Sequence, residues 1–261
     1  MLKSLTILFI LIANQAYAID ITEKDFSDYS LVNIHQGTNE VILTFDDGPT
    51  PGVTDKILDI LKTYDLKATF FVVGANAARY PDLMNRIMNE GHILGNHSMN
   101  HINLNKVGFF FKERKVKAEI MNAHKVLSPY TVNNKHFYFR APEGAWGGED
   151  YAHFLNETEI GRAYIGPVFW DIGGEIELVD GQYLQAADWA CWSKKPIALT
   201  IDECMSGYIN EIETKKGGVV LMHDIRPQSA EMLEKLIPQL QTRGFKFSTL
   251  NDIDWSTKEQ N

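Results

Sequence analysis

The sequence predicts a single-domain α/β protein with a buried parallel sheet, closed as a barrel or doubly wound. Short apolar strand segments alternate with amphipathic helical segments, and no Pro- or Ser-rich linker or internal repeat divides the chain. Its 261 residues, 44% hydrophobic and 23% charged, exclude disorder for most of the chain. The net charge of -9 argues against a nucleic-acid partner, because an acidic surface repels phosphates.

The N-terminal residues 1–18 predict a secretory signal peptide. Lys3 precedes an apolar run from Leu5 to Ala13, and Ala16-Tyr17-Ala18 fits a cleavage site. The run is shorter than the roughly 20 residues that span a bilayer, and a buried helix or an uncleaved anchor is the alternative. We therefore expect a periplasmic or secreted protein without a stable membrane anchor. Residues 19–40 are polar and predict an irregular lead-in to a domain of residues 41–261.

The strands are expected where short apolar runs, rich in β-branched and aromatic residues, end in turn residues. These runs are Val41–Phe45, Ala68–Val73, His92–Gly95, His136–Arg140, Tyr164–Trp170, Val219–Met222 and one that starts with Phe245–Phe247. Helical spacing of apolar residues predicts helices over Val53–Tyr64, Pro81–Glu90, Lys112–Leu127, Glu149–Glu157, Ile209–Lys215 and Ser229–Arg243. Thr54 is a candidate N-cap, and Gly91 and Gly244 stand just past helix ends. Residues 171–201 show no clear pattern.

Three polar clusters directly follow predicted strands: Asp46-Asp47, the segment from His97 to His101, and His223-Asp224. The carboxyl ends of parallel strands meet at one edge of a sheet, so we expect these clusters to converge. Two histidines four apart would reach one ion from a helical turn.

Two imidazoles and a carboxylate suit a catalytic divalent metal, with zinc as the default, because they leave coordination positions open. One of Asp46 and Asp47 could supply the carboxylate and the other a general base, with His223 as general acid. Each feature alone also has a non-catalytic explanation. Asp46–Pro49 fits a simple turn, the spacing of His97 and His101 could arise by chance, and His223 fits a structural histidine.

The same residues resemble the polysaccharide deacetylases of the NodB-homology class, carbohydrate esterase family 4. Thr44–Pro49 (TFDDGP) is similar to the first family motif, and His97-Ser98-x-x-His101 to the second. Arg140–Gly144 resembles the third motif and Leu221-Met222-His223 the fifth. The resemblance runs from about Val41 to Ile253. It implies a distorted (β/α) barrel that hydrolyses N-acetyl groups on a sugar polymer.

By this resemblance, Asp47, His97 and His101 would bind the metal, and Asp46 would be the general base. Arg140 would keep Asp46 charged and oriented, because a nearby cation favours the ionised carboxylate.

The remaining assignments carried by the resemblance concern the substrate. His223 would protonate the leaving amine, and Leu221 would line the acetyl pocket. A backbone N–H of Glu143, or of a neighbour in its turn, would join the metal in stabilising the oxyanion. Glu143 departs from the family, which usually has an aromatic residue there. Trp146, in the glycine-rich segment 144–148, is a candidate sugar contact, with core packing as the alternative.

The fourth family motif is displaced in this chain. The family typically has a strand that ends in Trp, followed a few residues later by Asp-Trp. Here Trp170-Asp171 fits the strand end, but Asp188-Trp189 comes much later. We therefore expect an insertion within 173–187 and Asp188 as the residue that orients His223, with Asp171 as the competing candidate.

The substrate expected from this resemblance is peptidoglycan, because the signal peptide looks bacterial. Chitin oligosaccharides and O-acetylated xylan are the alternatives. Asp47, the second Asp of the first motif, is intact, as in members directed at N-acetylglucosamine. A catalytically silent glycan-binding protein on the same fold is the alternative of another class. The sequence says nothing about the oligomeric state.

The two cysteines, Cys191 and Cys204, are close in sequence. Export permits a disulfide between them, and we favour this pairing over two separate thiols.

Overall fold

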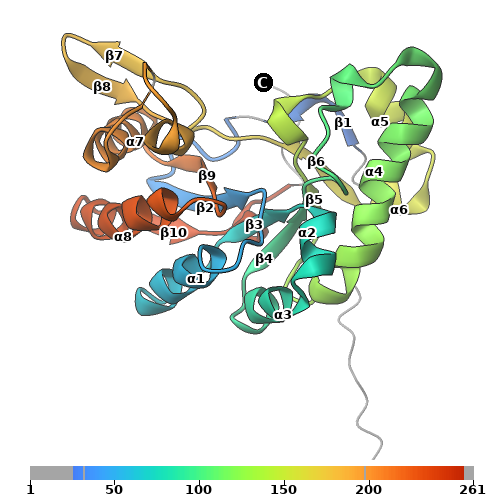
Figure 1. Cartoon of the computed structure of the whole chain (residues 1–261), viewed down its shortest axis with the longest axis horizontal. Coiled ribbons are helices and arrows are strands. Elements are labelled where there is room, and N and C mark those ends of the chain that lie inside the picture. The colour runs from blue at the N-terminus through green and yellow to red at the C-terminus, as the bar shows by residue number, and fades with distance from the viewer. Residues whose placement is uncertain (1–25, 32, 197, 256–261) are drawn as a thin grey trace, which may run out of the picture.

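The computed structural model describes residues 26–31, 33–196 and 198–255 (Figure 1). The predicted signal peptide, residues 1–18, lies outside this part of the chain. Within it, no helix combines the length and apolar character that crossing a bilayer requires.

Eight parallel strands form one curled sheet at the centre of the molecule, with helices around it (Figure 1). The strands are β1 (Phe26–Leu31), β2 (Glu40–Asp46), β3 (Thr69–Val72), β4 (Ile93–Asn96), β5 (Phe137–Phe139), β6 (Tyr164–Val168), β9 (Gly218–His223) and β10 (Lys246–Ser248). They follow the order β1-β6-β5-β4-β3-β2-β10, and β9 also pairs with β2. After β6 the chain crosses to β9, where Ile172 pairs with Val220. This curl confirms the predicted distorted (β/α) barrel.

The helices confirm most of the predicted pattern. They are α1 (Thr54–Thr63), α2 (Gly74–Arg79), α3 (Pro81–Asn89), α4 (Lys112–Leu127), α5 (Glu149–Asn156), α6 (Glu159–Arg162), α7 (Ile201–Lys215) and α8 (Pro227–Thr242). Short 3-10 turns include η1 (Leu104–Lys106), η2 (Phe109–Phe111), η4 (Pro142–Gly144) and η5 (Asp188–Trp192).

Strand alternation separates an outer core beneath the helices from an inner core enclosed by the sheet. In β2, Leu43 and Phe45 pack in the outer core, whereas Ile42 packs in the inner one. Since successive side chains of a strand point to opposite faces, Thr44 and Asp46 share the inner face with Ile42.

The same alternation of side chains along each strand places the other site residues on the inner face of the sheet. In β9, Val219 belongs to the inner core, so Leu221 and His223 face inward. In β5, Tyr138 is an inner residue, so Arg140 follows on that face. Gly95, also on the inner face, has to be glycine, because a Cβ atom there would lie 2.3 Å from the ring of Phe71.

The prediction was wrong at several boundaries. Helix α7 begins at Ile201 rather than Ile209, because Thr200 and Glu203 form a capping box that starts it early. Thr54 is not an N-cap: that position is Val53, and the Thr54 hydroxyl instead donates to Asp224.

Three strands lie where no strand was expected. The segment 19–40, predicted to be irregular, contains β1, which pairs with β6. Within residues 173–187, β7 (Glu177–Val179) and β8 (Gln182–Gln185) form an antiparallel hairpin. Asp180 and Gly181 connect them with φ values of 50° and 81°, the backbone that a two-residue hairpin turn requires.

The predicted disulfide between Cys191 and Cys204 is present. It joins η5 to α7, so it fixes the segment that carries Asp188.

Candidate active site

Asp46 and Asp47 stand at the carboxyl end of β2. Asp46 ends the strand, is 3% exposed and faces inward. The following residue of a regular strand would face outward. Asp47 instead has a φ of 78°, which breaks the alternation. Both carboxylates therefore reach the same group of side chains.

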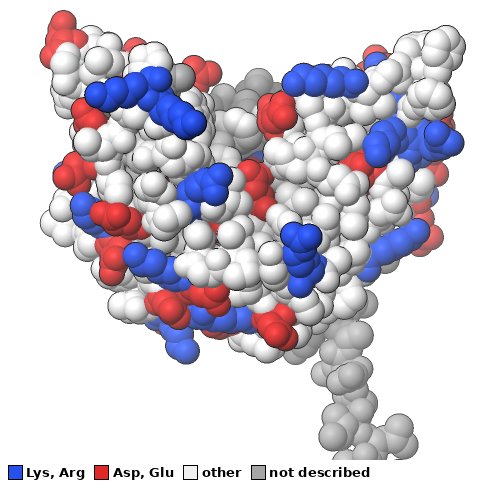
Figure 2. Space-filling view, viewed as in Figure 1, with Lys and Arg blue, Asp and Glu red and all other residues white. Residues whose placement is uncertain are grey.

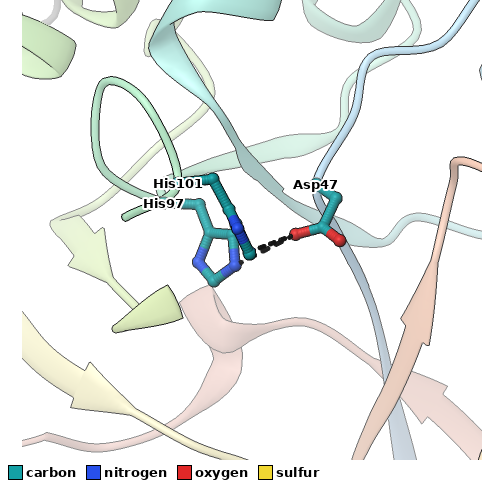
Figure 3. A group of neighbouring side chains, drawn as sticks. All are labelled: Asp47, His97 and His101. Carbon is teal, nitrogen blue, oxygen red and sulfur yellow. Dashed lines mark ion pairs between the residues drawn. The ribbon is translucent and has the colours of Figure 1, made fainter. Parts of the chain in front are cut away.

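Asp47, His97 and His101 meet in one cluster, with ligand atoms within 4.8 Å of one another (Figure 3). Asp47 Oδ1 lies 2.9 Å from His101 Nε2 and 3.3 Å from His97 Nε2. The predicted convergence is confirmed, but the helical turn that was expected to produce it is wrong. Residues 97–101 form a loop with positive φ at Ser98 and His101, and Ser98 Oγ accepts the His101 N–H.

These residues fit a divalent metal. Asp47 Oδ1 is buried and makes no hydrogen bond, although two imidazole nitrogens face it. His97 Nδ1 lies 2.9 Å from the Arg140 carbonyl oxygen, which can only accept, so Nδ1 carries the proton and Nε2 is left as a ligand.

Arg140 is fully buried beneath the cluster and fixes Asp46. Its Nη1 donates to Asp46 Oδ1 at 2.7 Å, and its guanidinium lies 4.1 Å from the centre of the Phe71 ring. Its other acceptors are Thr44 Oγ1 and the carbonyl oxygens of Val168 and Phe169. Asp46 Oδ2 remains on the side of the metal cluster, 3.7 Å from His97 Nε2.

His223, at the end of β9, is held by Asp188. Its Nδ1 lies 2.8 Å from Asp188 Oδ1, and its backbone N–H donates to Asp188 Oδ2 at 2.7 Å. Burial lowers the pKa of His223, but the carboxylate of Asp188 more than offsets this and raises the pKa to about 9. The competing candidate, Asp171, instead accepts the backbone N–H groups of Asn33 and of Val219. Val219 lies at the start of β9, at the opposite end of the strand from His223.

Comparison with known proteins identifies the family. The family model described as polysaccharide deacetylase matches residues 34–156. A peptidoglycan-N-acetylglucosamine deacetylase of Bacillus cereus is 32% identical over 225 residues, which cover 85% of this chain and 70% of that protein. The chain belongs to the polysaccharide deacetylase family.

Two further proteins are similar to this chain over most of its length. A chitooligosaccharide deacetylase of Sinorhizobium fredii is 29% identical over 227 residues, covering 82% of this chain and 91% of that protein. The solved structure of a peptidoglycan N-acetylglucosamine deacetylase in complex with an N-hydroxybenzamide has a TM-score of 0.67 and 28% identity. That match covers 90% of this chain and 96% of the other.

Leu221 and Glu143, two of the predicted substrate-side residues, do not belong to the metal cluster itself. Leu221 is 4% exposed and faces inward two residues before His223. Glu143 has a φ of 55° in η4, and its carboxylate accepts the Asn103 side-chain amide at 2.6 Å.

Trp146 is partly buried against the core cluster that contains Phe139 and Tyr151, with ring centroids 5.7 and 5.4 Å away. This contact is the core packing that the sequence offered as the alternative for Trp146.

Three further residues support the site but had no assigned role. Trp192 packs edge-on against His223, with ring centroids 5.8 Å apart. Ser229 Oγ donates to Asp188 Oδ2 at 2.6 Å. Asp224 is buried, donates its N–H to the Asp46 carbonyl and accepts the Thr54 hydroxyl. Asp224 had a sequence signal in its place directly after His223 at a strand end, and Trp192 had one only as a member of an aromatic-rich segment.

Proposed function

We propose that this protein is a metal-dependent hydrolase that removes N-acetyl groups from N-acetylglucosamine residues of an extracytoplasmic glycan. One observation carries the proposal. Asp47, His97 and His101 form a cluster that fits a metal, and next to it Arg140 binds Oδ1 of Asp46 but not Oδ2. His223, whose imidazole is held by Asp188, ends strand β9, which pairs with the strand that ends in Asp46. Together they would supply a Lewis acid, a general base and a general acid, which a metal-dependent amide hydrolase can use in one reaction.

Asp46 is proposed as the general base. Arg140 occupies Oδ1, so Oδ2 is available to take a proton from the attacking water. When bound at Asp47, His97 and His101, a divalent cation, with zinc as our default, supplies Lewis acidity to the reaction.

His223 is proposed as the general acid. Asp188 holds its Nδ1 proton, so the Nε2 proton is the one that can pass to the leaving amine nitrogen as the C–N bond breaks. The products are acetate and a free amine on the sugar. We further propose that a backbone N–H at Glu143 helps to stabilise the oxyanion and that Leu221 lines the acetyl pocket, as in the family pattern.

The substrate proposed first is peptidoglycan. The Bacillus cereus relative and the structurally similar protein are both peptidoglycan N-acetylglucosamine deacetylases, and the predicted signal peptide would export the chain to the periplasm or beyond. The Sinorhizobium fredii relative acts on chitooligosaccharides, so these are the second candidate. His101 and Asp47 retain 32% and 20% side-chain exposure, which leaves the cluster open to a polymer.

Acetate release from purified peptidoglycan, chitin oligosaccharides and acetylxylan tests the proposal. We expect release from peptidoglycan at the highest kcat/KM, and none from the Asp46→Asn variant. Glycan binding without acetate from any of the three would favour the catalytically silent protein. A higher kcat/KM on chitin oligosaccharides would replace the substrate but keep the reaction.

A further inference from the structure

A protruding apolar tip is the most unusual surface feature outside the site. Phe109, Phe110 and Phe111 form η2 at the start of α4, and they are 82%, 92% and 59% exposed. In Figure 1 this end of α4 is the upper right corner, and Figure 2 shows an uncharged projection there. Three adjacent rings in water are unfavourable, and exposed apolar patches of this kind mark contact surfaces.

Basic residues outnumber acidic ones in the sequence around the tip, although Glu113 and Asp150 also lie beside Phe109 and Phe110. Between residues 106 and 117 the sequence has five basic residues and one acidic residue, although the whole chain is acidic. The guanidinium of Arg114 lies 5.4 Å from the centre of the Phe111 ring, and among the residues placed by the structure it has no ion pair. Lys106 is 78% exposed, with Glu143 3.9 Å away. Lys112, Lys115 and Lys117 have acidic partners, so few of these cations are unpaired.

A second apolar tip provides an internal comparison. The β7–β8 hairpin exposes Leu178 and Val179 by 55% and 42%. Its neighbours Glu175, Glu177 and Asp180 are acidic and exposed, so this tip would be repelled by an anionic surface. Of these two tips, the phenylalanine tip is the one that combines exposed rings with cations.

We propose that Phe109–Phe111 inserts into the interface of an anionic lipid bilayer and holds the protein at the membrane surface reversibly. Aromatic rings partition into the headgroup region, and Lys and Arg beside them bind anionic lipids. A partner of this kind requires no membrane-spanning helix. Only residues 102–108 separate the tip from His101, so binding would bring the proposed metal loop close to the membrane.

Vesicle flotation tests this proposal with two matched variants in the same full-length background. The variants are Phe109→Ser/Phe110→Ser and, as control, Leu178→Ser/Val179→Ser. We expect the wild type and the hairpin control to float equally with phosphatidylglycerol–phosphatidylcholine vesicles. Replacing the two rings should weaken this binding about tenfold or more, and added salt should weaken it further.

Several results would overturn the proposal. These are no flotation of the wild type, equal flotation of the phenylalanine variant, or equal binding to pure phosphatidylcholine vesicles. If the rings instead serve the glycan, their loss would weaken sedimentation with insoluble peptidoglycan and leave vesicle binding unchanged. Circular dichroism and acetate release from a small soluble substrate should match the wild type for both variants. If the wild type released no acetate, the proposed function would be overturned, but the result of the vesicle experiment would still stand.

Discussion

The carboxylate of Asp188 holds both the side chain and the backbone of His223, with Oδ1 2.8 Å from Nδ1 and Oδ2 2.7 Å from the main-chain nitrogen. Because Asp188 is fully buried and also accepts the Ser229 hydroxyl, it has little freedom to move. This contact keeps the Nδ1 proton in place and the imidazole charged at neutral pH, which is the state that a general acid needs.

Asp188→Asn should lower the pKa of His223 from about 9 toward its usual value. The alkaline limb of the kcat/KM profile should then move to lower pH by at least one unit, with kcat reduced about 10²-fold. Asp171→Asn is the matched control, since Asp171 binds Val219 instead, and its alkaline limb should stay in place. An unchanged limb in Asp188→Asn would contradict the assignment.

The same pKa shift predicts a pH dependence of stability. In the folded protein the pKa of His223 is about 9, above the ordinary 6.5. The stabilisation that the His223–Asp188 pair contributes is therefore complete below pH 6.5. It should be lost as the pH rises through about 9, measured as the free energy of unfolding in denaturant. In Asp188→Asn this alkaline decline should be absent.

The two adjacent aspartates should separate metal binding from turnover. Asp47→Ala removes the oxygen that faces both imidazoles, so bound metal should fall well below one per chain. Asp46→Asn should keep the metal and lose about 10²-fold or more in kcat, since its proposed role is proton transfer. Metal analysis of both purified variants decides this. Metal loss in Asp46→Asn with retention in Asp47→Ala would show that the roles are exchanged.

Arg140→Met should destabilise the protein by about 3–5 kcal/mol, because it leaves the buried Asp46 carboxylate without its cation. Adding Asp46→Asn should restore part of this free energy of unfolding. Arg243→Met is the surface control. Arg243 pairs with an exposed Glu213, and its loss should cost no more than about 1 kcal/mol. Equal effects of the two single variants would contradict the buried ion pair.

Cys191→Ser/Cys204→Ser should lower the free energy of unfolding by about 3 kcal/mol, as expected for a loop closed by residues 13 apart. Because the bridge fixes η5, which carries Asp188 and Trp192, kcat should fall while bound metal is retained. The intact mass of the wild-type protein, measured with and without reductant, checks the bridge directly. A wild-type mass that reductant leaves unchanged would show that the two thiols are free.

Much of the site could be predicted because strand ends position it. Asp46, His97 and His223 follow apolar runs, and parallel strands bring such ends to one edge. The loop at 97–101 was mistaken for a helical turn because spacing alone does not show the positive φ of Ser98.

Contacts between distant segments had no comparable signal. Ser229 meets Asp188 only because α8 packs against η5, and Trp192 meets His223 only because the disulfide and α7 position η5. The choice between Asp171 and Asp188 likewise required three-dimensional placement. The hairpin could have been found, since Asp180-Gly181 is a strong turn signal between alternating residues.

The most direct test is acetate release from peptidoglycan by the protein before chelation, after chelation and after reconstitution with one equivalent of zinc. We predict that chelation abolishes release, that zinc restores it in the wild type, and that zinc fails to restore it in Asp47→Ala. Acetate release that persists in the fully metal-free protein would contradict the account.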